Sequence, residues 1–310
     1  MTNPMKAEHI RADTDWFRDA KWGVLTHYLA DDRLTPEQWN EQVDRFDVEG
    51  LADQLSGIGA KYYFITIGQN SGHYCATNEA YDSFVGIRPS KCSKRDLISD
   101  LYEVLNPRGI KLMVYLPSGA PDRDPVAREK LEWEPGIWEP RSCRRLASFQ
   151  VRWEAVIGEW SLRWGTRICG WWIDGCYYAD SMYRHTDPPN FQSFAAALKA
   201  GNPNSVIAFN PGVLTPVILL THYEDYTAGE IDQAFPVCPG RWVDGAQYHI
   251  LSYLGETWGK GKPRFVDEFV LGYTRNVTAK GGVVTWDAPI SKGGLIEQPF
   301  VDQLSILGSL

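Results

Sequence analysis

The segment Cys169-Gly170-Trp171-Trp172-Ile173-Asp174-Gly175 joins an apolar run to a single carboxylate and a glycine. Such a run is typical of a strand packed on both faces, as in a parallel sheet. Side chains alternate along a strand, which places Trp172 and Asp174 on the same face. Parallel α/β sheets and barrels carry their chemistry at the carboxyl ends of their strands. Asp174 is therefore a candidate site residue, and an N-cap for the next helix is the alternative interpretation.

Similar apolar runs alternate with helix-like segments along the 310-residue chain. We expect strands at 22–28, 62–67, 111–116 and 206–210 and over the run from Cys169 to Asp174, and further ones near 223–227, 248–253 and 282–286. Helical spacing predicts helices at 46–58, 96–105, 145–164 and 191–199. This alternation, at about eight units, predicts an α/β fold of the (β/α)8 TIM-barrel type. With no repeat or Pro/Ser-rich linker, we expect one domain over 1–310, with 117–141 as a loop roofing the pocket.

Composition narrows the class of partner. The net charge is −8 and no Lys/Arg block occurs, so we expect no nucleic-acid partner. The first 19 residues lack an apolar core, and no run could span a bilayer, so we expect no membrane partner and a cytoplasmic location. A removed signal peptide, with a periplasmic or secreted location, stays open, as does a homo-oligomer. Six cysteines stand singly, which favours reduced thiols over disulfides, and neither histidine spacing nor a glycine-rich phosphate loop predicts a metal or cofactor.

Polar and aromatic side chains cluster where predicted strands end. His27 lies at the end of the first strand, and Gln69, Asn70, His73 and Tyr74 follow the second. Flat rings beside hydrogen-bonding groups are typical of sugar sites, although ordinary pockets share this mixture. The alternatives are a core histidine at 27 and a simple turn after the second strand.

Three further strand-end residues are candidates for the same cavity. Trp172 shares the face of Asp174, whereas Asn210 and Trp286 follow the fifth and last predicted strands. For Asn210 and Trp286 a place in the core is the equal alternative.

Several segments resemble the α-L-fucosidases of glycoside hydrolase family 29, in consistent order along the chain. They are Trp16–Gly23, Thr26–Tyr28, Gly59–Tyr63, Arg95–Leu97, Arg108–Lys111, Trp171–Gly175, Asp225–Glu230 and Ala279–Gly282. The resemblance implies a barrel glycosidase in which Asp174 is the nucleophile, Glu230 is the acid/base and His27 binds the sugar. Among neighbouring acids, Glu224 is the main rival of Glu230.

Two departures from that family concern the substrate and the end of the chain. Gln69 and Asn70 stand where the family has two sugar-binding histidines, and Ser71 stands where it has an aspartate. Amides still bind vicinal hydroxyls but do not become charged near neutral pH. The chain stops soon after the last predicted strand, so we expect no C-terminal β-sandwich.

The resulting hypothesis is retaining hydrolysis of a terminal α-L-fucoside-like residue, with carbohydrate as the substrate. Retention predicts carboxyl groups about 5–5.5 Å apart, and inversion about 6.5–9.5 Å. Two alternatives stay open: a glycosidase of the same superfamily acting on another sugar, and a barrel that binds carbohydrate without turnover.

Overall fold

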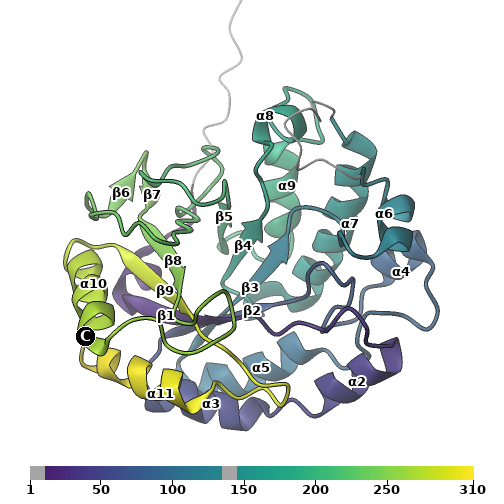
Figure 1. Cartoon of the computed structure of the whole chain (residues 1–310). Helices are drawn as coiled ribbons and strands as arrows, with labels where there is room; N and C mark the ends of the chain where they lie inside the picture. Colours follow the sequence, from purple (N-terminus) through teal and green to yellow (C-terminus); the bar gives the residue numbers. More distant parts are fainter. Residues whose placement is uncertain (1–10, 135–144) are drawn as a thin grey trace, which may run out of the picture.

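A computed structural model describes residues 11–134 and 145–310, and its centre is a seven-stranded parallel sheet (Figure 1). The strand order is β5-β4-β3-β2-β1-β9-β8. The strands are β1 (Trp22–Thr26), β2 (Tyr62–Thr66), β3 (Lys111–Pro117), β4 (Gly170–Asp174), β5 (Val206–Phe209), β8 (His249–Tyr253) and β9 (Val283–Asp287). These confirm the strands predicted at the same positions. A separate antiparallel pair, β6 (Trp242–Val243) and β7 (Ala246–Gln247), lies outside this sheet.

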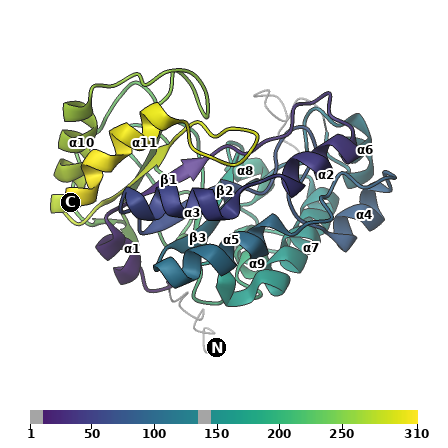
Figure 2. The same ribbon diagram turned by 90° about the horizontal axis from the view of Figure 1, so that it is seen from below.

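Helices alternate with the strands, and most of them cover one face of the sheet. They are α1 (Asp15–Ala20), α2 (Pro36–Asp44), α3 (Val48–Gly57), α4 (Glu79–Val85), α5 (Leu97–Leu105), α6 (Pro125–Leu131), α7 (Ala147–Trp164), α8 (Ala179–Met182), α9 (Phe191–Leu198), α10 (Asp267–Ala279) and α11 (Gln298–Ser305). Figure 2 shows α11, α3 and α5 side by side across this face. The helix α1 instead packs its Phe17 into the cluster on the other face. The four predicted helices are confirmed, and three of them begin at side chains that accept a backbone N–H: Asp47, Asp96 and Asn190.

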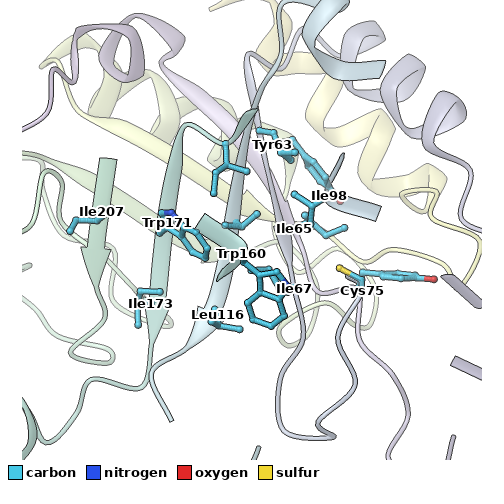
Figure 3. Packing of buried hydrophobic residues seen from close by; sticks show 14 of the residues in the cluster. Tyr63, Ile65, Ile67, Cys75, Ile98, Leu116, Trp160, Trp171, Ile173 and Ile207 are labelled. Atoms are coloured by element: carbon cyan, nitrogen blue, oxygen red, sulfur yellow. The ribbon is translucent and has the colours of Figure 1, made fainter. Parts of the chain in front are cut away.

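The two faces of the sheet bury different side chains. Trp171 and Ile173 of β4 point toward the helices, where Trp160 of α7 belongs to the same cluster (Figure 3). Trp172 points to the opposite, inner face and packs in a second cluster that contains Tyr62 and Tyr115. This alternation confirms that neighbouring residues of the 170–174 strand divide between two faces.

The strand expected near 223–227 does not form as a regular strand. Residues 225–231 nevertheless lie between β5 and β8, because Asp225 N–H donates to Ile207 and Ile231 N–H donates to Leu251. Only isolated bridges connect this segment to its neighbours, since Gly229, at φ +62°, interrupts the extended backbone. The described residues therefore show a curled sheet in the form of a half-barrel, in place of the predicted eight regular strands.

The segment expected as a long loop over the pocket is partly helical. It contains α6, which Asp124 caps by accepting the backbone N–H groups of Val126 and Ala127. Its residues 135–141 lie outside the described residues, as do residues 1–10 and Cys143. The other five cysteines are free thiols.

We predict that Gly229→Ala destabilises the protein strongly. A Cβ at this position would lie 1.9 Å from the backbone oxygen of His249, and the positive φ adds strain. We expect the free energy of unfolding in urea to fall by about 3 kcal/mol or more. Gly57→Ala is the matched control, because a Cβ there meets nothing within 4 Å, and we expect a change below about 1 kcal/mol. Equal effects of the two substitutions would contradict this account.

Candidate active site

A cavity of about 970 Å³ opens at the carboxyl ends of the strands. Its lining comes from strands β3, β4 and β8, from the segments that follow β1, β2, β3, β8 and β9, and from the 225–231 segment. The lining residues are His27, Leu29, Ala30, Asp31, Asp32, Arg33, Gln69, Asn70, Ser71, Tyr115, Arg123, Trp172, Asp174, Glu230, Leu251, Trp258, Gly259, Lys260, Gly261, Ile290, Lys292 and Glu297. The sequence-predicted residues His27, Gln69, Asn70, Trp172, Asp174 and Glu230 thus meet in one cavity.

Asp174 ends β4 and is oriented by hydrogen bonds from both neighbouring strands. Tyr115 of β3 donates its hydroxyl to Oδ2 at 2.5 Å, and Asn210, just after β5, donates Nδ2 to Oδ1 at 2.8 Å. Burial, followed by the charge of Asp174, raises the pKa of Tyr115 well above its usual range, so the phenol remains a donor. The carboxylate is therefore held in one orientation at the cavity wall.

Glu230 lies beside Asp174 because the same amide contacts both. Asn210 Nδ2 donates to Oε2 of Glu230 at 2.6 Å as well as to Asp174. The two carboxylate oxygens therefore lie no farther apart than the sum of 2.8 and 2.6 Å, about 5.4 Å.

The environment of Glu230 favours its protonated form. Burial is the largest cause, the charge of Asp174 adds to it, and together they raise the pKa of Glu230 from 4.5 to about 7. The Asn210 hydrogen bond and the charge of His27 act in the opposite direction. One carboxyl group of the pair can thus hold a proton near neutral pH.

His27 is fixed from behind by a buried aspartate. Its Nδ1 is 2.8 Å from Oδ1 of Asp287, whose other oxygen accepts the backbone N–H of Gly259 at 2.6 Å. Burial of the imidazole opposes protonation, but the charge and hydrogen bond of Asp287 outweigh it, and the pKa of His27 is raised. The ring therefore faces the cavity in a defined orientation beside Tyr115 and Trp258.

The amide of Gln69 is engaged by the protein itself. Its Nε2 donates to the hydroxyl of Tyr115 at 2.6 Å, which continues the chain of hydrogen bonds to Asp174. Asn70 lines the cavity next to it, and its backbone oxygen accepts the N–H of Arg123. Of the two amides at the family's histidine positions, Gln69 therefore orients Tyr115.

His73, Tyr74 and Trp286 line no part of this cavity. The ring of Tyr74 packs in the core between Tyr81 and Trp160. His73 is buried beside Trp39, and neither ring nitrogen has a hydrogen-bond partner among the described residues. Trp286 is buried on the helix side of the sheet, because β9 continues to Asp287 and alternation turns Asp287 to the opposite face, where it holds His27.

The rival acid Glu224 is also turned away from the cavity. It is fully buried, and its carboxylate accepts the backbone N–H groups of Phe209, Leu220 and Thr221. Burial raises the pKa of Glu224 to about 8, but the carboxyl serves to hold the 220–224 turn. Of the two rivals, only Glu230 faces Asp174.

The sequence pattern did not indicate Trp258, Asp287, Lys260 or Lys292. Trp258 and Lys260 lie in a loop with no strand pattern, so only the fold brings them to the cavity. The signal for Asp287 was present: it follows Trp286 in an apolar strand, as Asp174 follows Ile173.

Two searches over residues 11–134 and 145–310 gave nothing. No group of three or more His, Cys, Asp or Glu side chains is arranged to hold a metal ion. No helix has both the length and the apolar character that crossing a membrane requires.

The chain matches solved structures, whereas no family model and no curated protein sequence matches it. An endo-fucoidan hydrolase of glycoside hydrolase family 107 aligns with a TM-score of 0.69 and 17% identity, covering 94% of this chain and 90% of that one. A second endo-fucoidan hydrolase of that family gives 0.72 and 18%, covering 96% of this chain and 53% of that one, so this chain spans about half its length. An α-L-fucosidase of family 29 from Bacteroides thetaiotaomicron gives 0.63 and 15%, covering 99% and 76%.

These likenesses establish the fold. The chain has the fold of fucose-acting glycoside hydrolases, and the resemblance to family 29 is confirmed at that level. At identities of 14–18%, the roles of individual residues rest on the geometry of this chain.

We predict that His73 makes the protein less stable in acid. Burial, with the charge of Lys91, lowers the pKa of His73 to about 4, below the 6.5 of an exposed histidine. The unfolded chain takes up this proton below pH 6.5 and the folded chain does not, so stability falls between pH 6.5 and 4. The slope is at most about 1.4 kcal/mol per pH unit for this group.

Urea unfolding at several pH values between 7.5 and 4.5 tests the prediction. We expect His73→Leu to lose less stability than the wild type across this range. His249, whose pKa burial also lowers to about 4, contributes the same slope to both proteins. Identical pH dependence of the two proteins would show that folding leaves the pKa of His73 unchanged, and would contradict the prediction.

Proposed function

We propose that the protein is a retaining glycoside hydrolase that cleaves an α-L-fucoside-like linkage. One observation carries the proposal: a single amide nitrogen binds both carboxylates, so the two oxygens that it contacts, Asp174 Oδ1 and Glu230 Oε2, lie within about 5.4 Å of each other. Retaining enzymes hold the pair about 5–5.5 Å apart, whereas inverting enzymes need about 6.5–9.5 Å to admit a water molecule. The separation supports retention.

The surroundings of the two carboxyl groups suit them to different catalytic roles. Asp174, oriented by Tyr115 and Asn210, attacks the anomeric carbon and forms a covalent glycosyl-enzyme. Glu230, protonated near neutral pH, transfers its proton to the leaving oxygen as the glycosidic bond breaks. Glu230 then removes a proton from the water that releases the sugar from Asp174, which restores both groups.

Side chains around Asp174 and Glu230 bind the sugar. His27, held by Asp287, and Asn70 present hydrogen-bonding groups to the cavity. Trp172 and Trp258 supply flat apolar walls of the kind that cover the C–H faces of a sugar ring. The family 29 fucosidases and family 107 endo-fucoidan hydrolases with this fold favour fucose as the sugar.

A second candidate is cleavage within a chain of sugars. The cavity, at about 970 Å³, reaches the upper end of the roughly 300–1,000 Å³ of pockets that hold drug-sized ligands. This volume has room for more than one sugar residue, and solved structures of the same fold include endo-fucoidan hydrolases. Cleavage within an extended substrate is therefore the second hypothesis beside cleavage of a terminal fucoside.

We predict distinct effects for the two carboxylates on hydrolysis of aryl α-L-fucosides. Asp174→Ala should lower kcat by about 10³-fold or more, because no nucleophile remains. Glu230→Gln should lower kcat/KM about 10²-fold for a phenyl leaving group and far less for dinitrophenyl, which needs no acid. The wild-type kcat/KM should fall above pH 7, as Glu230 loses its proton, and Glu230→Gln should lack this limb.

Glu297→Gln is the control, since this carboxylate lines the same cavity outside the pair. We expect it to keep the pH limb and most of kcat. Full activity of Asp174→Ala would overturn the mechanism, and sugar binding by the wild type without turnover would favour the non-catalytic alternative. Turnover confined to other aryl glycosides in a panel would redirect the sugar assignment.

We predict that a longer substrate is hydrolysed with a higher kcat/KM than a single fucoside. Additional sugar residues in the cavity supply binding energy that can be used in the transition state. We expect kcat/KM for a fuco-oligosaccharide to exceed that for phenyl α-L-fucoside at least about tenfold. Product chromatography then separates the two modes: internal cleavage yields oligosaccharides first, and terminal cleavage yields only monosaccharide.

A further inference from the structure

Asn210 is fixed in place by its burial and by its backbone contacts. Its side chain is fully buried, its backbone N–H donates to Ile173 at 2.7 Å, and its backbone oxygen accepts the N–H of Cys176 at 3.0 Å. Both contacts tie it to the β4 segment that carries Asp174. The amide therefore keeps a fixed position relative to this carboxylate.

The orientation of the amide is fixed as well. Gly212 N–H donates to Asn210 Oδ1 at 3.0 Å, so a flipped amide would lose this bond and place its oxygen against two carboxylates. Gly212 reaches this position at φ +91°, and a Cβ there would lie 3.2 Å from the ring of Tyr177. The NH2 end must therefore face Asp174 and Glu230.

Both hydrogens of this NH2 group have an acceptor. One points to Oδ1 of Asp174 and the other to Oε2 of Glu230. An amide nitrogen donates a hydrogen bond and does not accept one. A proton on Oε2 would have to point away from the amide, and a hydroxyl oxygen accepts more weakly than a carbonyl oxygen, so the contact favours a bare oxygen at Oε2.

We infer that Asn210 is a positioning residue that bridges the two carboxylates and directs the catalytic proton of Glu230 to Oε1, the oxygen it does not contact. The inference rests on the proposed function, in which Glu230 is the acid. It gives Asn210 a role in the reaction in place of the sugar contact that the sequence predicted. The same bridge holds the pair at the separation that retention needs.

The bridge also sets the proton affinity of Glu230. The titratable groups that interact with Glu230 through their charges are Asp174, Asp232, His27, Tyr115, Tyr177 and Tyr253. Against burial and the charges of Asp174 and Asp232, the Asn210 hydrogen bond lowers the pKa of Glu230. Loss of the bridge should therefore raise that pKa and allow the proton on either oxygen.

The test uses Asn210→Ala, which removes the amide, and Asn210→Asp, which keeps its shape and replaces the donor with an acceptor. The Glu230 carboxyl is titrated directly by ¹³C NMR with labelled glutamate, and its signal is assigned by its absence in Glu230→Gln. We expect the pKa to rise by at least about 0.5 unit in both variants, a threefold change in proton affinity. The exposed neighbour Asn204→Ala should leave the titration at its wild-type position.

Kinetics supply the second readout. In both variants the alkaline limb of kcat/KM should move to higher pH. The loss of kcat should be at least about tenfold larger for the phenyl fucoside than for the dinitrophenyl fucoside. A folded variant whose titration stays at the wild-type position overturns the inference, as does an equal loss for both leaving groups. A shifted titration in a protein without hydrolysis would uphold the bridge and instead defeat the proposed function.

Discussion

Parallel pairing of β4 with its two neighbours is the constraint on which the site depends. Register pairs Tyr115 with Trp172 and Pro117 with Asp174 on one side, and Ile173 with Phe209 on the other. Tyr115 therefore reaches Asp174 from β3, stacked on Trp172, and the residue after Phe209 reaches it from beyond β5. A shift of one residue in either pairing would turn these donors to the helix face.

The same pairing gives the sheet two different faces. Toward the helices it buries large apolar rings such as Trp171, whose cluster includes Trp160 and Trp164. Toward the cavity it buries rings mixed with hydroxyl, amide and carboxyl groups. Burial on that side strengthens every charge interaction, which is why a second carboxylate beside Asp174 retains its proton.

The segment after β5 places three nearby acidic side chains in three different environments. Glu224 binds backbone N–H groups of its own turn, and Asp225 pairs with Lys199 at 2.7 Å in the interior. Gly229 then turns the backbone out of regular strand geometry, and Glu230 enters the cavity. The irregular backbone at this position is the local exception in an otherwise regular sheet, and it carries a proposed catalytic group.

The sequence by itself determined the order of strands and helices, the face shared by Trp172 and Asp174, and most strand-end residues of the cavity, because local periodicity encodes all three. It could not choose between Glu224 and Glu230, since both follow the same apolar run and only their distant partners differ. The sequence pattern also ended the last strand one residue early, at Trp286. It therefore selected the buried Trp286 as the strand-end residue in place of Asp287. The tertiary structure alone decided these points, and it alone placed Asn210 between two carboxylates, because that contact joins β4, β5 and the 225–231 segment, which only the folded sheet brings together.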